Sequence, residues 1–328
     1  MKKVGVGLYG TAGHQIQGAL ADHPMAQWVS AAEFSEVPSG VRLHDSLGAL
    51  LADPEVDLIS FCSPRRDEQG GHILTALDAG KHVYAEKPCC TDETTLDRIL
   101  EAAERSGKVV HEMAATAFEQ PYCTLRDLIQ AGEIGDVLQI LSQKSYPWTD
   151  WRPDDEGMDG GLALQAGIYH TRFIEHVAGM RIVDLRIEES RLGNNHPSSD
   201  CRRAVSFLAR LENGGLASAV SNYACPEPPA WGNWGYDELR VFGTRGFVEV
   251  MNGGESGRLV REGHPPLPLD FTHEVPAFLE GVFQEVLTGK PVSPLTLEEE
   301  LRPTRWVIRA KADLRKRTLQ KGESNAAS

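Results

Sequence analysis

Over its first 120 residues the chain alternates short apolar runs with amphipathic helical patterns, and this alternation allows few folds. A strand, a helix and a second strand form a parallel unit, and several such units build a sheet with helices on both faces. The pattern therefore predicts an α/β domain with a doubly wound parallel sheet. We expect strands at 4–9, 28–34, 57–62, 82–85 and 109–113, and helices at 14–22, 68–79 and 92–107.

The sequence pattern changes near Pro121, where segments in which apolar and polar residues alternate begin to dominate. Asn213-Gly214 joins two of these runs and is typical of a tight hairpin, because both residues tolerate positive φ. The second part is therefore predicted to be an α+β domain with a large, mostly antiparallel sheet. A chain of 328 residues is long enough for two domains, which we place at 1–120 and 121–328. We expect strands at 137–143, 182–190, 204–212, 216–223, 239–242 and 247–250, and helices at 122–131, 275–288 and 297–317.

Composition excludes several classes of function. The formal net charge of -14 offers no field to attract nucleic acid or an anionic membrane surface. The six cysteines lack metal-site spacing, and no stretch resembles a signal peptide or a membrane span. Isolated pairs such as His111-Glu112 lack a third ligand, so no metal site is predicted. We expect a cytoplasmic protein that acts on a small molecule.

A glycine-rich turn at 7–13 follows the first predicted strand. Glycines at this place let the backbone approach a pyrophosphate, which then binds the amides at the start of the next helix. Because the motif is degenerate, an ordinary strand–helix turn is the alternative. The candidate dinucleotide contacts here are Gly10, Thr11, Ala12 and Gly13.

Glu33 ends the second predicted strand, near the spacing of about 20 residues at which an acid binds the adenosine ribose hydroxyls. A carboxylate there repels a 2′-phosphate, so NAD is the preferred cofactor. Arg65 and Arg66 in the next strand–helix loop leave NADP as an alternative cofactor. Glu36 is the alternative acid for the contact with the ribose.

The segment 76–88, which ends in Glu86-Lys87-Pro88, resembles the signature of the Gfo/Idh/MocA oxidoreductases, relatives of glucose–fructose oxidoreductase and inositol 2-dehydrogenase. Matches at 53–57, 63–64, 132–135 and 160–167 extend the likeness over most of the chain. The resemblance implies that Lys87 reaches the reacting hydroxyl or carbonyl, where an ammonium stabilises a developing alkoxide. The candidate cofactor contacts in these loops are Ser63, Pro64, Arg65, Glu86 and Lys87.

Many members of this family carry Asp-x-Gly-x-His on a helix of the second domain, and here Gln165 and Tyr169 stand at the acid and histidine positions. A tyrosine there is similar to the dihydrodiol dehydrogenase branch, in which it transfers the proton. A phenol with a pKa of about 10 needs a nearby cation to ionise near neutrality. His170, about 100° away around the helix, is the alternative base. Gln165 can only orient the substrate, and packing roles for Tyr169 and His170 are the plainer alternative.

The segment 144–155 is rich in aromatic and polar residues, which suit the faces and hydroxyls of a sugar or polyol ring. Lys144, Trp151 and Arg152 are candidate substrate contacts with Lys87, Gln165 and Tyr169. Arg152 would favour a carboxylated sugar, and the alternative is that it simply pairs with Asp150 or Asp154. We therefore expect NAD(P)-dependent hydride transfer to or from a secondary alcohol of a sugar, cyclitol or related polyol.

Two other functions are compatible with the same residues. One is an NAD-using glycosidase of the same family, and the other is a non-catalytic regulator that binds a dinucleotide or a sugar. By resemblance, a homodimer or homotetramer formed through the sheet of the second domain is expected.

Overall fold

The structure, a computed structural model, describes residues 2–113, 115–149, 152–194, 199–226, 235–291 and 293–326, with side chains to residue 320. Contacts divide the chain into two units. The first comprises Met1–Ala115, Gly157–Gly160 and Pro276–Arg305, and the second comprises Thr116–Glu156, Gly161–Val275 and Trp306–Ser328. The segment 276–305 thus belongs to the first unit, whereas the sequence-based division at 120/121 placed it in the second.

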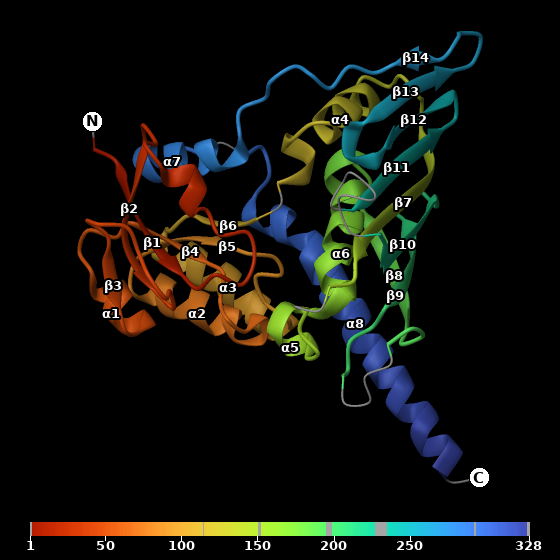
Figure 1. Cartoon of the computed structure of the whole chain (residues 1–328). Coiled ribbons are helices and arrows are strands. Elements are labelled where there is room, and N and C mark those ends of the chain that lie inside the picture. The colour runs from red at the N-terminus through yellow and green to blue at the C-terminus, as the bar shows by residue number, and fades with distance from the viewer. Residues whose placement is uncertain are drawn as a thin grey trace. The chain divides into compact units, whose positions relative to one another are not determined.

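A six-stranded sheet with the order β3-β2-β1-β4-β5-β6 forms the centre of the first unit (Figure 1). All of its strand pairs are parallel, which confirms the predicted doubly wound sheet. The elements are β1 (Val4–Tyr9), η1 (Gln17–Leu20), β2 (Ala26–Ala32), β3 (Arg42–His44), α1 (Leu47–Ala52), β4 (Leu58–Phe61), α2 (Arg66–Asp78), β5 (His82–Ala85), α3 (Glu93–Ser106), β6 (Val110–Glu112), α7 (Phe278–Thr288) and the start of α8 (Leu297–Ala326).

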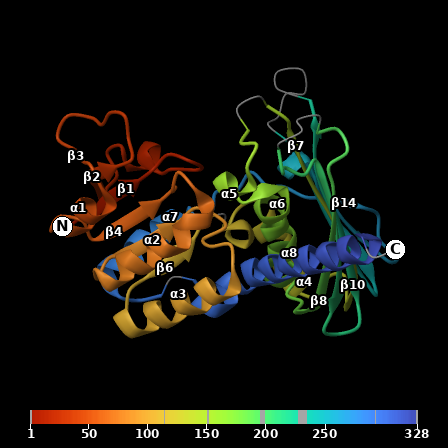
Figure 2. The ribbon, with the colours of Figure 1, turned by 90° about the horizontal axis from the view of Figure 1, so that it is seen from below.

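The alternation of β1 explains how helices cover both faces of this sheet. Its apolar side chains Val4, Val6 and Leu8 share one buried cluster with Val282 and Phe283 of α7. Glycine residues occupy the other face, where a Cβ on Gly7 would lie 2.9 Å from the side chain of Ile59. Figures 1 and 2 show α1, α2 and α3 on the face opposite α7.

The helix predicted at 14–22 is wrong, because the segment contains only the 3₁₀ turn η1. The side chain of Gln15 folds back and donates to the carbonyl oxygens of Gly10 and Ser60 at 2.9 and 3.2 Å. Hydrogen bonds from a side chain to the backbone compete with those of a helix. Pro24 follows shortly after the segment and disfavours a helical backbone in the residue before it. The connection from β1 to β2 is therefore a tight loop.

β3 and α1 were not predicted, and a buried carboxylate explains why they form. Asp53 accepts hydrogen bonds from Ser30 of β2 and Arg42 of β3, and from the amide of Glu55. Burial alone would raise the pKa of Asp53, but these partners hold it well below its usual range. Asp53 therefore ties the edge of the sheet to the end of α1.

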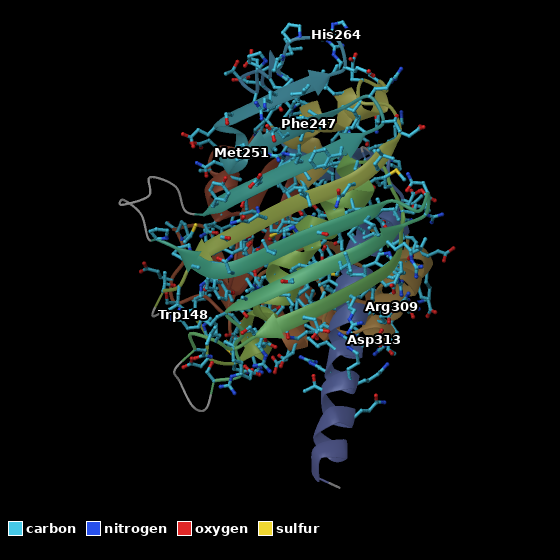
Figure 3. The ribbon with its side chains drawn as sticks, turned by 90° about the vertical axis from the view of Figure 1, so that its right-hand side faces the viewer. Trp148, Phe247, Met251, His264, Arg309 and Asp313 are labelled. Carbon is cyan, nitrogen blue, oxygen red and sulfur yellow. The ribbon has the colours of Figure 1, made fainter. Side chains whose placement is uncertain are left out.

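The second unit is built on an eight-stranded sheet with the order β14-β13-β12-β11-β7-β10-β9-β8. Only β7 and β10 pair in parallel among its described strands, which confirms a mostly antiparallel sheet. Helices α4 and α6 lie on one face (Figures 1 and 2), and Figure 3 shows the other face without helices. In the described parts of the chain, no helix has the length and apolar character needed to cross a membrane. The elements are η2 (Thr116–Phe118), α4 (Tyr122–Gln130), β7 (Val137–Pro147), α5 (Glu156–Asp159), α6 (Gly161–Arg172), the π-helical turn η3 (Phe173–Val177), β8 (Ile182–Ser190), β9 (Ala204–Leu211), β10 (Leu216–Cys225), β11 (Tyr236–Gly243), β12 (Gly246–Met251), η4 (Asn252–Gly254), β13 (Ser256–Arg261), β14 (Leu267–Pro268) and the rest of α8.

Within the first unit, His111 of β6 holds the returning segment 276–305. Its Nδ1 lies 2.8 Å from Glu300 Oε2, and its Nε2 lies 3.2 Å from Glu285 Oε2. Burial alone would lower the pKa of His111, but the two carboxylates outweigh burial and raise it to about 10. His111 is therefore a charged link between β6, α7 and α8.

Replacing His111 with glutamine is expected to lower the free energy of unfolding by about 3 kcal/mol, because two buried carboxylates lose their shared cation. The folded-state pKa is raised above 6.5, so this stabilisation is full below about pH 6.5 and is lost as the pH rises through about 10. Urea unfolding at about pH 6 and about pH 9.5 should therefore show the larger difference from wild type at the lower pH. The exposed His264→Gln serves as the control. An equal loss at both pH values would contradict this assignment.

Candidate cofactor and substrate sites

The predicted cofactor residues gather at the carboxyl edge of the parallel sheet. The strand order reverses between β1 and β4, which is where such sheets bind ligands. The turn at 10–13 follows β1, residues 63–65 follow β4, and Glu86-Lys87 follow β5. The amide of Ala12 donates to the carbonyl of Cys62 at 3.1 Å, which joins the first two of these loops.

Two glycines let the turn pass close to its neighbours. Gly10 has a φ of +72°, and a Cβ there would lie 2.3 Å from the carbonyl oxygen of Cys62. Gly13 has a φ of +138°, and a Cβ there would lie 2.7 Å from the side chain of Glu86. Larger residues would clash with these neighbours, so the two glycines allow the turn to pack directly against the loops that follow β4 and β5.

The turn fits a dinucleotide pyrophosphate, although not in the predicted way. The α-helix whose amides were expected to bind it is replaced by η1. Of the amides at 10–14, only that of the exposed Thr11 has no acceptor among the described residues. The Thr11 amide is therefore the group of this turn that could bind the pyrophosphate.

A buried Arg66–Gln69 pair supports these loops. Arg66 is 1% exposed, and its guanidinium donates to the Ala12 carbonyl and to Gln69 Oε1, while its buried Nε has no partner. Gln69 Oε1 also accepts from the Ser63 amide, and its Nε2 donates to the carbonyls of Glu86 and Pro88. These two side chains therefore link all three loops and place a positive charge beneath the glycine turn.

Arg66→Gln is expected to raise the dissociation constant of NAD about tenfold, because the turn loses a charge-assisted hydrogen bond and its nearby cation. Arg66→Lys retains the charge and should recover part of the affinity. Titration by nicotinamide fluorescence, with thermal melting to confirm folding, measures both effects. Affinity within twofold of wild type in folded Arg66→Gln would show that Arg66 only packs.

Glu86 and Lys87 are buried side by side, 1% and 4% exposed. The amide and Nδ1 of His14 lie 2.6 and 3.0 Å from Glu86 Oε2, and Lys87 Nζ lies 4.0 Å from Glu86 Oε1. Burial alone would raise the pKa of Glu86, but His14, Lys87 and Arg66 lower it to about 2. Lys87 therefore sits beside a permanent carboxylate at the edge of the sheet.

Glu33 directly follows β2, is exposed, and has a φ of +58°. A non-glycine residue in this conformation is strained and is often found at functional sites. Burial, followed by the charges of Glu33 and Glu68, raises the pKa of Tyr9, so the Glu33 carboxylate lies near the end of β1. Arg65 forms a two-point ion pair with Asp67, whereas Arg66 is turned inward.

In the second unit, Lys144 supports Tyr169. Lys144 projects from β7 and is 5% exposed, and its Nζ lies 4.1 Å from the centre of the Tyr169 ring on α6. The same ammonium pairs with Asp237 on the neighbouring β11. Burial lowers the pKa of Lys144, and Asp237 opposes this shift. Lys144 was predicted as a substrate contact, but the structure encloses it between Tyr169 and Asp237.

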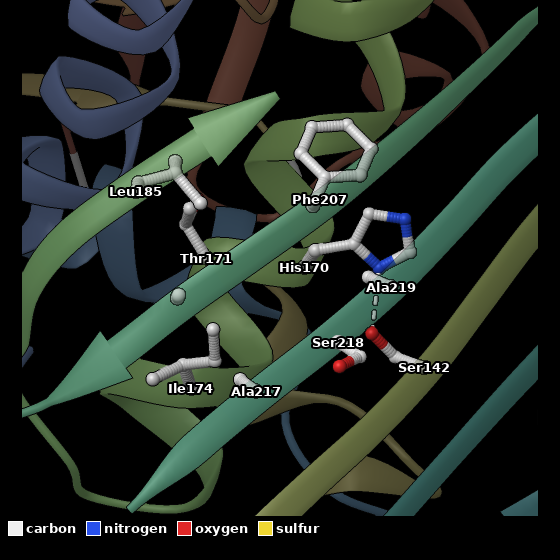
Figure 4. A pocket seen from close by; sticks show the side chains of 10 residues that line it. Ser142, His170, Thr171, Ile174, Leu185, Phe207, Ala217, Ser218 and Ala219 are labelled. Atoms are coloured by element: carbon white, nitrogen blue, oxygen red, sulfur yellow. Dashed lines mark hydrogen bonds between the residues drawn. The ribbon is translucent and has the colours of Figure 1, made fainter. Parts of the chain in front are cut away.

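His170 occupies the core of the second unit, which argues against its predicted role as the alternative base. Its Nδ1 lies 2.8 Å from the hydroxyl of Ser142 (Figure 4), and its Nε2 lies 2.8 Å from that of Ser221. Burial, with a smaller contribution from the charge of Lys144, lowers the pKa of His170 to about 3. The cavity of about 10 Å³ that His170 lines holds no more than about one water molecule.

Two other predicted substrate residues lie on described elements. Gln165 is one turn before Tyr169 on α6, and both are half-buried while the residues between them are buried. Arg152 donates from Nε to the Pro147 carbonyl at 3.1 Å, and its guanidinium lies 4.1 Å from the centre of the Tyr223 ring. Trp151 lies outside the described residues.

The structural roles of several residues at these sites were not predicted from the sequence, in which Arg66 was considered only as a possible NADP contact. Arg66 and Gln69 are both on the buried face of α2, although polar residues at the start of a helix usually suggest exposure. Asp237 is directly opposite Lys144 in the β11–β7 register, and Arg203 precedes β9. Only strand pairing brings these residues to their partners, so no local signal in the sequence marks them.

Comparison with known proteins agrees with this geometry. Residues 6–113 match the family described as an oxidoreductase family with an NAD-binding Rossmann fold, and residues 122–249 match the GFO/IDH/MocA C-terminal domain. A solved structure of aldose-aldose oxidoreductase from Caulobacter crescentus complexed with glycerol superposes with a TM-score of 0.80, at 19% identity, over 95% of this chain and 98% of that one.

Two curated relatives are similar in sequence. The 1-carboxy-3-chloro-3,4-dihydroxycyclohexa-1,5-diene dehydrogenase of Comamonas testosteroni is 26% identical over 71% of this chain and 61% of its own length. The trans-1,2-dihydrobenzene-1,2-diol dehydrogenase of Bos taurus is 27% identical over 88% of this chain and 85% of its own length. Because the family matches cover most of the chain and both of its units, the chain belongs to the GFO/IDH/MocA oxidoreductase family.

Proposed function

We propose that this protein is an NAD(P)-dependent dehydrogenase that acts on a secondary alcohol of a sugar, cyclitol or related polyol. The observation that carries the proposal is the position of Lys87, directly after β5 at the edge that also carries the glycine turn. The relatives' names, which describe ring compounds with two hydroxyl groups, support a hydroxylated ring as the substrate.

Bound nicotinamide would accept or supply the hydride, and the chain's own groups would handle charge and proton. Lys87 would stabilise negative charge on the reacting oxygen, while Glu86 keeps the local charge balanced. Tyr169 would move the hydroxyl proton, and the pair of Lys144 and Asp237 would fix its ring. Glu33 supports a preference for NAD over NADP, because its exposed carboxylate repels a 2′-phosphate.

A panel of sugars, cyclitols, dihydrodiols and sugar acids with NAD and with NADP tests this proposal by the absorbance of reduced nicotinamide. Net reduction with at least one compound is the expected result. Cleavage of a glycoside without net reduction would instead support the glycosidase. Tight NAD binding without turnover of any compound would favour the regulator.

We also propose that the open face of the second unit's sheet pairs with a second copy of the chain. Exposed apolar side chains of β7, β9 and β10 line this face, including Leu141 at 36%, Leu208 at 53% and Val220 at 42%. Light scattering should report a dimer or tetramer, and Leu208→Glu should shift it towards monomer.

A cytoplasmic setting is proposed as well, since all six cysteines are free thiols.

A further inference from the structure

An arginine–aromatic cluster lies at one end of the second unit's sheet. It consists of Arg152, Arg203, Trp148 and Tyr223. The Arg203 guanidinium lies 3.9 Å from the centre of the Trp148 ring, and the Arg152 guanidinium lies 4.1 Å from that of Tyr223. The two rings meet edge to face at 5.4 Å. Aromatic faces therefore hold both cations at one place, although they come from different segments of the chain.

The charge of this cluster is unusual for so acidic a chain. The Arg203 guanidinium makes no ion pair or hydrogen bond to any described residue, whereas Arg42 and Arg240 each pair with a glutamate or aspartate. Burial lowers the pKa of Arg203, Tyr223 opposes this, and the nearby positive charge of Arg152 lowers it further. Two like charges held close together are unfavourable unless an anion joins them.

Stacking prepares these arginines to bind an anion. A guanidinium is planar and binds a carboxylate or phosphate with two parallel hydrogen bonds from its edge. Contact with the Trp148 ring through the face fixes the plane of the Arg203 guanidinium and leaves its edge available. Both side chains are only half-buried, so an anion can reach the cluster from solvent.

The cluster is on the same sheet face as the groups proposed to react. Alternate residues of a strand share a face, so Tyr146 of β7 is on the face of Lys144, and Tyr223 of β10 is on the face of Ser221, which pairs with Lys144. Lys144 Nζ lies 5.9 Å from the centre of the Tyr146 ring and 4.1 Å from that of Tyr169. Each such step along a strand is about 7 Å, so Tyr223 of the cluster is one step beyond the residue that pairs with Lys144. A polyol ring with an anionic arm has dimensions of this order.

We propose that Arg152 and Arg203, held on Tyr223 and Trp148, form a subsite for an anionic substituent of the substrate, a carboxylate or a phosphate on a polyol ring. This inference rests on the proposed dehydrogenase function and names the class of substrate. Arg152 was a predicted substrate contact, and the structure adds Arg203 as its partner.

The test uses two matched series of probes in the presence of NAD. The first is glucose, glucuronate and glucose 6-phosphate, and the second is myo-inositol, quinate and myo-inositol 1-phosphate. Dissociation constants are measured by calorimetry, and turnover by nicotinamide absorbance. Wild type should bind an anionic member at least about tenfold more tightly than the neutral member of the same series, since charged hydrogen bonds are worth about 1.5–3 kcal/mol. Each series contains one carboxylate probe and one phosphate probe, so the probe that binds more tightly shows which of the two anions the subsite takes.

Arg203→Gln should reduce that preference about tenfold, and Arg203→Lys should retain part of it. Arg210→Gln is the matched control, because it makes the same change at an exposed position of β9, the strand that Arg203 precedes, and should retain the full preference. Equal binding of neutral and anionic probes by wild type, or an undiminished preference in folded Arg203→Gln, would overturn the subsite. If the protein prefers anionic probes but turns none over, the dehydrogenase function is contradicted and the subsite stands. If the protein turns a probe over without preferring the anionic ones, the subsite is contradicted and the dehydrogenase function stands.

Discussion

Lys87→Met is expected to lower kcat/KM about a thousandfold, because the reacting oxygen loses the cation that stabilises its developing charge. The loss should appear mainly in kcat, since this charge develops only in the transition state. Lys87→Arg keeps the positive charge, but its planar head has a different shape and reach, so it should recover little activity. Initial rates with the best compound of the panel measure the effect.

The control for Lys87 is Lys290→Met, which removes the same charge at an exposed position of the first unit. Thermal melting must show that the Lys87 variants remain folded, because the buried Glu86 loses a nearby cation. Near wild-type turnover in folded Lys87→Met would remove Lys87 from the reaction. A pure increase in KM would instead limit Lys87 to binding.

Tyr169→Phe is the second large expected effect, with a loss of about 10²- to 10⁴-fold in kcat, because it removes only the hydroxyl that would move the proton. The ring that lies over Lys144 Nζ is retained, so the packing of α6 against Lys144 of β7 should be unchanged. Tyr236→Phe makes the same change on the opposite face of β11 from Asp237 and should keep full activity. Activity close to wild type in Tyr169→Phe would show that another group transfers the proton.

The sequence predicted those features of the fold that depend on local periodicity. The strands β1 and β5 have the predicted bounds, because each is an apolar run closed by turn residues. The segment 14–22 failed because the side chain of Gln15 bonds to the backbone and replaces helical hydrogen bonds. Local patterns cannot reveal such a competition, since it is decided by atoms on β4.

The site was predictable to a smaller degree. Glycine spacing and the run Glu86-Lys87-Pro88 pointed to loops that the structure places at one edge of the sheet, because each loop follows a predictable strand. The partners of Lys144 and Arg66 depend on register and on helix burial, which join residues far apart in sequence. The same limitation explains why His170 was considered as a base, since adjacent positions on α6 face opposite environments.

The return of residues 276–305 to the first unit also has a consequence for biosynthesis. The apolar face of β1 is completed by Val282 and Phe283, and His111 finds its two carboxylates only in this late segment. During translation the parallel sheet therefore emerges early but lacks its covering helix until α7 has left the ribosome. Its exposed strands are protected last, and premature termination before α7 would leave a fragment prone to aggregation rather than an independent domain.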